Sequence, residues 1–312
     1  MNHRPFLLEM PDKVMSRIIG FGGFQDLFKL RKVCRDLRTF IDENCPNVNC
    51  TSLSLTFLPN KISLVANFLD REDEEITYRK QENGCRIQNK LFEKLDFVHA
   101  FFDDIHLILK YLPPCLPRFS LKFQYTNDES DYYIPEVQKN LNIVLESRNT
   151  KLPVRKFVMN AFKEEQVLTI LPYLDPAFLE EIWILDSEFW LGVNKILETN
   201  GRCIPISTIT CFEHTTVAFV AFFWITLEDM ELIKETFFKS TTLQKLRFEY
   251  ANFPDCQQYF NIFGPPVENQ SEHCWILTEH GQTIRAIHNP VYKNITFEKI
   301  HQPNVSGDFV RQ

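Results

Sequence analysis

Glycine is scarce in this sequence, and its scarcity argues against nucleotide chemistry. Only 9 of the 312 residues are glycine, less than half of the usual share of about 7%. The run from Gly20 to Gly23 resembles the start of a dinucleotide-binding loop, but Gln25 stands where that loop needs its next glycine. The motifs G-x-x-x-x-G-K-[ST], G-x-S-x-G and H-E-x-x-H are absent from the sequence. We therefore expect no catalytic residues and no cofactor.

Long apolar runs and an excess of positive charge are also missing. The longest apolar run, Val217 to Ile225, has nine residues, whereas a membrane-spanning helix needs about 20. Met1 to Glu9 contains no apolar stretch of the length found in signal peptides. The net charge of −7 disfavours binding to phosphate backbones. These features predict a soluble cytoplasmic or nuclear protein with neither membrane nor nucleic acid as its main partner.

Cysteine and histidine give only weak signals of a metal site. The nine cysteines are an odd number without a C-x-x-C pair, which favours reduced thiols in an intracellular protein. Cys211 and His214 have the spacing of one half of a zinc site, but buried thiols and surface histidines are the favoured interpretation. His99, Asp103 and His106 share one helix face, which we interpret as its solvated side. We expect no metal.

Residues 1–45 form a small helical segment. Apolar residues recur there at spacings of three and four, which is typical of amphipathic helices, at Val14, Ile18, Phe21, Leu27, Leu30, Val33, Leu37 and Ile41. Gly22-Gly23 separates the first helix from the next, so we predict about three helices. A unit of this size buries little surface by itself. It must pack on the rest of the chain or present apolar surface to a partner.

The same segment carries a run of cations at Arg31, Lys32, Arg35 and Arg38. A basic helix can bind nucleic acid, but no stacking aromatic residues are interleaved with this run, and the net charge opposes that function. We favour a solvated helix face next to an apolar docking face.

Residues 46–312 repeat a pattern of short strands and helices. Apolar residues follow the pattern Φ-x-x-Φ-x-Φ from positions 50, 116, 154, 179, 206, 243 and 292, and segments with helical periodicity lie between several of these matches. Strand, helix, strand at such intervals predicts an irregular α/β solenoid resembling leucine-rich repeats. The expected fold class is therefore α+β, with a helical N-terminal domain followed by this solenoid.

In this pattern the residue between the last two apolar positions points away from the core. A solenoid aligns these residues as one surface, which here includes Trp183 and Arg247, with Lys156, Lys245 and Glu249 two residues away. Trp and Arg are enriched at binding hot spots. We therefore predict that these five residues form a partner-binding surface, unless a loop covers Trp183 or the repeat register is different.

Two stretches carry a resemblance to known families. Met10 to Ile19 and Phe24 to Arg38, with Pro11, the step Asp26-Leu27-x-x-Leu30 and the helix Val33-Cys34-Arg35-x-Leu37-Arg38, resemble an F-box. Ile170 to Pro176, followed by Leu179 to Ile184, resembles the FTH domain that accompanies F-boxes in a large nematode family. The resemblance implies an F-box at 1–45 and an FTH-like region at about 135–265.

An F-box implies docking on the Skp-type adaptor of a cullin-RING ubiquitin ligase. The family's apolar docking positions fall here on Pro11, Val14, Ile18, Leu27, Leu30 and Val33. The expected function is that of a non-enzymatic substrate receptor, whose C-terminal domain binds a protein target. The alternative is an F-box scaffold that acts outside ubiquitin transfer, for example in translational or RNA-associated regulation.

Overall fold

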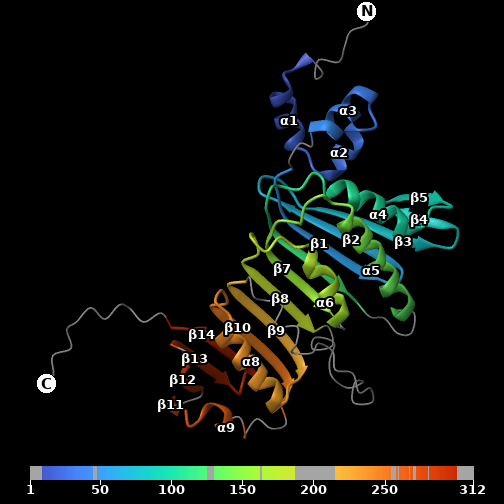
Figure 1. The fold of residues 1–312 in the computed structure, drawn as a ribbon. Helices are drawn as coiled ribbons and strands as arrows, with labels where there is room; N and C mark the ends of the chain where they lie inside the picture. The colour runs from blue at the N-terminus through green and yellow to red at the C-terminus, as the bar shows by residue number, and fades with distance from the viewer. Residues whose placement is uncertain are drawn as a thin grey trace, which may run out of the picture. The chain divides into compact units, whose positions relative to one another are not determined.

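The computed structural model describes residues 9–44, 48–124, 130–161, 164–186, 215–253, 258, 260–266, 268–269, 272–279 and 281–300. The chain divides into two compact units, which we consider separately. The first comprises Met1–Phe157 and Pro172–Phe178, and the second comprises Val158–Leu171 and Leu179–Gln312. Each unit contains both helices and strands (Figure 1). A mixed helix-and-strand fold is thereby confirmed.

The first unit begins with the three predicted helices, which are α1 (Asp12–Gly20), α2 (Phe24–Leu30) and α3 (Arg35–Asn44). Their spacing of apolar residues buries one side of each helix. The buried side chains are Met15, Ile19, Phe24, Leu27, Leu37, Phe40 and Ile41. So few buried residues make a very small core, which agrees with the expectation that this segment needs a further surface to pack on.

A sheet follows, with the strand order β6-β1-β2-β3-β4-β5 within the first unit. The strands are β1 (Cys50–Leu58), β2 (Lys61–Phe68), β3 (Glu74–Gln81), β4 (Gly84–Ile87), β5 (Lys90–Glu93) and β6 (Leu116–Phe123). Helix α4 (Phe97–Ile108) packs on this sheet through Phe101, whose ring lies 5.6 Å from that of Phe57 and 5.5 Å from that of Tyr78. Helix α5 (Ser130–Glu146) lies beside α4 (Figure 1). The core of this unit lies between these helices and the sheet.

The three N-terminal helices join this sheet through a compact polar and aromatic contact. Gly23 gives α2 no side-chain cap, and the Glu74 carboxylate of β3 instead accepts the Gln25 backbone N–H at 3.3 Å. Arg71 bonds Glu74 at 2.5 Å and lies 3.7 Å from the centre of the Phe68 ring, which in turn contacts Phe24. A Cβ atom on Gly23 would stand 1.5 Å from the Arg71 guanidinium. A larger residue at position 23 would therefore displace the ends of the Arg71 and Glu74 side chains.

The second unit also combines parallel and antiparallel strands. Its strand order is β11-β12-β13-β14-β10-β9-β8, in which β8, β9 and β10 are parallel. The strands are β8 (Glu181–Asp186), β9 (Val217–Trp224), β10 (Lys245–Asn252), β11 (Glu268–Asn269), β12 (His273–Glu279), β13 (Gln282–Asn289) and β14 (Asn294–Lys299). Strand β7 (Val154–Ala161) crosses the division between the units.

Helix α8 (Leu227–Lys239) connects β9 to β10 and begins with a capping box between Thr226 and Asp229. It packs on the sheet through its buried side, where the Phe237 ring lies 5.7 Å from that of Phe297 on β14. The remaining short helices are α6 (Glu164–Ile170), the 3₁₀ turn η2 (Leu171–Tyr173) and α9 (Phe260–Phe263).

The structure does not show a leucine-rich-repeat solenoid. The predicted strands from positions 50, 116, 154, 179 and 243 are present as β1, β6, β7, β8 and β10, whereas positions 206–211 lie outside the described residues. The repeat pattern did not contain the antiparallel strands β2 to β5 and β11 to β13. Two-residue turns such as Pro59-Asn60 join adjacent strands as hairpins, which a repeat of parallel strands cannot include. Tyr292, taken as apolar core, is 73% exposed in a turn.

Phe24 is the aromatic anchor of the N-terminal helices. We predict that Phe24→Ala lowers the free energy of unfolding by about 3 kcal/mol or more, because a fully buried ring is lost from its contact with Phe68. Urea denaturation followed by circular dichroism measures the change. Phe21→Ala is the matched control, since this ring is 60% exposed and its loss should cost less than about 0.5 kcal/mol. Equal effects of the two substitutions would show that Phe24 has no anchoring role.

A buried histidine makes the stability of the second unit depend on pH. His288 is 2% exposed and its Nε2 lies 2.6 Å from the Tyr250 hydroxyl, with the His273 ring stacked 5.8 Å away. Burial, together with the smaller effect of the neighbouring His273, lowers the pKa of His288 to about 4. The folded state therefore keeps this ring neutral at pH values at which the unfolded chain binds a proton.

We predict that this histidine costs the fold about 2–3 kcal/mol as the pH falls from about 6.5 to 4. Chemical denaturation at several pH values should give a shallower decline for His288→Gln than for the unchanged protein. The control His99→Gln removes an exposed histidine and should keep the full decline. Parallel curves for His288→Gln and the unchanged protein would contradict the prediction.

Candidate protein-binding surfaces

Helix α1 presents one apolar side to solvent. Val14, Ile18 and Phe21 are 45%, 42% and 60% exposed, and with the exposed Pro11 they fall at spacings of three and four, which places them on one helix face. We call these four residues the α1 apolar face. Their neighbours Met15 and Ile19 point into the helical core instead. Contiguous exposed apolar side chains on a small helical unit are typical of an interaction site.

The other predicted docking residues occupy different positions. Val33 lies exposed in the turn between α2 and α3, and Leu30 is half-buried at the end of α2. Leu27 is fully buried, so its side chain stabilises the helical core and is not available at the surface. Phe21 was not among the predicted docking residues, although its spacing from Val14 and Ile18 could have indicated it.

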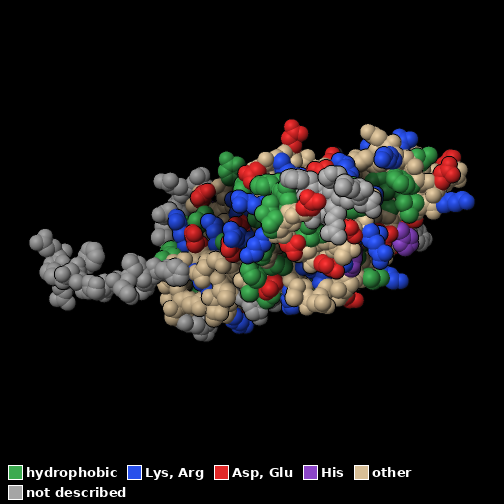
Figure 2. Space-filling view, turned by 90° about the horizontal axis from the view of Figure 1, so that it is seen from above, with side chains coloured by type: hydrophobic (Ala, Val, Ile, Leu, Met, Phe, Trp, Pro, Cys, Tyr) green, Lys and Arg blue, Asp and Glu red, His purple; other side chains and the backbone are tan. Residues whose placement is uncertain are grey.

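Part of the predicted basic run is used within the helical segment itself. Arg31 makes two hydrogen bonds to the Asp42 carboxylate, at 2.7 and 2.9 Å, and Arg38 lies 3.8 Å from the same group. The Arg31 bond lowers the pKa of Asp42. Asp42 also accepts a bond from the Tyr111 hydroxyl at 3.0 Å, which joins α3 to the end of α4. Figure 2 shows acidic and basic side chains intermixed on the visible face of the molecule.

In the second unit, one transverse row of the sheet brings together two of the predicted target-binding residues. The strand register places Trp183 of β8 beside Phe219 of β9, Phe219 beside Arg247 of β10, and Arg247 beside Thr296 of β14. The Trp183 and Phe219 rings lie 5.0 Å apart, and the Arg247 guanidinium lies 5.8 Å from the centre of the Phe219 ring. We call Trp183, Phe219 and Arg247 the aromatic row.

The aromatic row lies on the sheet face opposite α8. Leu246 and Phe248 of β10 are fully buried on the helix side, and side chains alternate along a strand, so Arg247 points the other way. Trp183 and Phe219 are half-buried there and Arg247 is exposed. With Leu185 and Val217 they line a groove of about 420 Å³.

The charged groups beside this groove contact neighbouring side chains. Trp183 donates its indole N–H to Glu181 at 3.1 Å, and Arg247 bonds Glu249 at 2.9 Å. Lys245 lies 3.8 Å from Glu298 of β14. The surface that remains for a ligand is therefore mainly apolar and aromatic.

The remaining residues predicted for this surface belong to different units of the structure. Lys245 and Glu249 line the same groove as Trp183 and Arg247. Lys156 lies half-buried on β7 and belongs to the first unit. Phe219 was missed, because the predicted intervening strand was 206–211, which lies outside the described residues, whereas the described strand between β8 and β10 is β9.

The other candidate chemistry is sparse in the residues that the structure describes. Among them, no group of three or more His, Cys, Asp or Glu side chains could hold a metal ion. His106 contacts the Ser147 hydroxyl at 3.3 Å, and His99 and Asp103 are exposed. Cys211 and His214 lie outside the described residues. No helix in the described ranges is long and apolar enough to cross a membrane.

Comparison with known families accounts for both the helical segment and a large part of the remainder. Residues 7–49 match the F-box domain, so the chain contains an F-box. Residues 135–266 match the FTH domain, so the chain combines an F-box with an FTH domain. No curated protein and no solved structure matches the chain.

The F-box indicates a general class of function. It implies binding to Skp-type adaptors and, through them, to a cullin complex. F-box proteins are in general adaptor or receptor subunits of SCF-type ubiquitin ligases rather than enzymes.

Proposed function

We propose that this protein is the substrate-recognition subunit of an SCF-type cullin-RING ubiquitin ligase. In this proposal residues 1–45 dock on the Skp-type adaptor, and the domain formed by 46–312 binds a protein target. The observation that carries it is the exposed α1 apolar face within a matched F-box. Such a receptor makes and breaks no bonds. It raises the effective concentration of the target near the catalytic module of the ligase.

We infer the adaptor contact from the different burial of neighbouring apolar residues. Met15, Ile19 and Leu27 close the helical core, so the α1 apolar face is not needed for folding. An apolar helix face is buried efficiently in a groove of a partner. We propose that Pro11, Val14, Ile18 and Phe21 make this contact, with Val33 and Leu30 at its margin.

For the target we propose the groove of the aromatic row. Trp and Arg are over-represented among residues that dominate binding energy, and an aromatic ring left half-exposed gains by further burial. Because the flanking charges are already paired, a matching target segment contributes apolar or aromatic side chains. Lys245 and Glu249 form the charged border of this groove.

The alternative function is that of an F-box scaffold outside ubiquitin transfer. Affinity purification of the full chain from cells distinguishes the two functions. Recovery of adaptor and cullin together, read by mass spectrometry with the proteasome and neddylation inhibited, supports the receptor. Recovery of the adaptor without any cullin would contradict it.

We predict that Val14→Asp combined with Ile18→Asp weakens adaptor binding at least about 100-fold, because two charges would have to be buried in an apolar contact. Binding of the purified full chain to the adaptor is measured by calorimetry. Melting should change little, since both residues are exposed. The control Leu232→Asp places a charge on an equally exposed site of α8 and should bind normally. Normal binding by the double variant would refute the docking face.

We predict that Trp183→Ala combined with Arg247→Ala weakens target capture by about 2 kcal/mol or more, roughly 30-fold, and leaves adaptor binding unchanged. Quantitative mass spectrometry compares the proteins retained by each form of the chain. Tyr292→Ala with Lys239→Ala removes a similar exposed ring and cation elsewhere in the second unit and is the matched control. If both double variants retain the same proteins in the same amounts, the groove is not the target site.

A further inference from the structure

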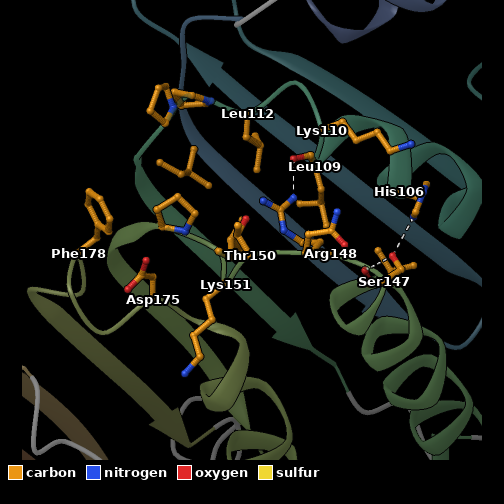
Figure 3. A pocket seen from close by; sticks show the side chains of 17 residues that line it. His106, Leu109, Lys110, Leu112, Ser147, Arg148, Thr150, Lys151, Asp175 and Phe178 are labelled. Atoms are coloured by element: carbon orange, nitrogen blue, oxygen red, sulfur yellow. Dashed lines mark hydrogen bonds between the residues drawn. The ribbon is translucent and has the colours of Figure 1, made fainter. Parts of the chain in front are cut away.

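The first unit contains a second pocket, which lies where two helices end. It has a volume of about 510 Å³ and is lined by residues that follow α4, residues that follow α5, and the turn from Asp175 to Phe178. Figure 3 shows Arg148 in the middle of this pocket and Lys110 and Lys151 at opposite edges, with their side chains directed away from Arg148. None of these residues belongs to the α1 apolar face or to the aromatic row.

Arg148 carries a positive charge that the protein leaves largely uncompensated. Its Nη1 donates to the Leu109 carbonyl oxygen at 2.7 Å, which caps the end of α4. Its Nε is buried and has no partner among the residues described. No carboxylate of the described chain pairs with this guanidinium. Burial lowers the pKa of Arg148, which reflects the cost of keeping the cation there.

Lys110 and Lys151 add to this charge, and neither forms an ion pair with any described part of the chain. Asp175 is the one acidic residue in the lining, and one oxygen of its carboxylate accepts the Ala177 backbone N–H at 3.0 Å.

The C-terminal ends of helices α4 and α5 also contribute to the charge around the pocket. Each helix C-terminus contributes roughly half a negative charge, and the two ends together offset about one cation. The pocket lining contains three cations, and their charge is opposed by the Asp175 carboxylate and the two helix ends. The local excess that remains is about one positive charge. This excess stands in a chain whose net charge is −7.

The rest of the lining is suited to an organic group. The lining includes Leu112, Pro113 and Pro114, and Phe178 lies across the pocket from His106 (Figure 3). A volume of this size is typical of small-ligand sites. An anion without an organic part would leave these apolar surfaces without a contact.

We propose that this pocket binds a phosphate ester. The guanidinium of Arg148 pairs with the phosphoryl oxygens, Lys110 and Lys151 neutralise the remaining charge, and the apolar rim contacts the organic part of the ligand. The shared chemistry is the phosphoryl group, which can belong to a small phosphate ester or to a phosphorylated side chain of a protein. This proposal is independent of adaptor docking, so either can fail without the other.

Isothermal titration calorimetry on the full chain tests the site with defined probes. These are phenyl phosphate, N-acetyl-O-phosphoserine amide and inorganic phosphate, with N-acetylserine amide as the uncharged control. We expect both esters to bind more tightly than inorganic phosphate, and N-acetylserine amide not to bind. Tighter binding of phenyl phosphate assigns the site to small esters, and tighter binding of the phosphoserine compound assigns it to a modified protein. Failure of both esters to bind at about 10 mM would overturn the proposal.

Lys110→Gln with Lys151→Gln should weaken binding of the better ester about tenfold without changing the melting temperature, because both lysines are exposed. Arg148→Lys keeps the charge but loses the planar fork, and should weaken binding further. Lys80→Gln with Lys122→Gln removes two exposed lysines from β3 and β6 and is the matched control for charge. If both lysine pairs reduce the affinity equally, the effect is general electrostatics and the pocket is not the site.

Discussion

The contact of Arg71 and Glu74 with the start of α2 is the interaction on which the N-terminal part of the molecule depends. The three helices bury too little surface to form a stable unit alone, and α2 begins at a glycine without a side-chain cap. The sheet supplies both missing contributions, through the Glu74 carboxylate at the helix start and the Phe68 ring beneath Phe24. Because folding is completed on this side, α1 can keep an apolar face for a partner.

The same principle applies in the second unit, where one side of the sheet provides stability and the other side can provide binding. Phe237 and its neighbours on α8 cover the side of Leu246 and Phe248. The opposite side keeps the aromatic row, with its charges paired between neighbouring residues. Residues that fold the chain and residues proposed to bind partners are thus mostly different, so each set can be altered without the other.

Periodicity in the sequence predicted the elements better than their arrangement. Spacings of three and four located α1 to α3, and the strand pattern located β1, β6, β7, β8 and β10, because both report the local burial of side chains. The antiparallel hairpins were missed, since pairing depends on which strands meet in space. Spacing alone also did not show which apolar residues are buried. Leu27 lies in the core, whereas Ile18 lies at the surface. The pocket around Arg148 could not be predicted, because its lining comes from three segments distant in the sequence.

The capping of α2 by a strand that follows it in the chain has a consequence for biosynthesis. The ribosome releases the F-box helices first, but the backbone N–H of Gln25 can form its hydrogen bond only after Glu74 has been synthesised. Phe24 likewise stays without its partner ring until Phe68 has been synthesised. The segment proposed to bind the adaptor is therefore completed only after the hairpin of β2 and β3 has emerged. A nascent chain interrupted before that point lacks a finished F-box, so the proposed docking on an adaptor depends on the presence of the sheet.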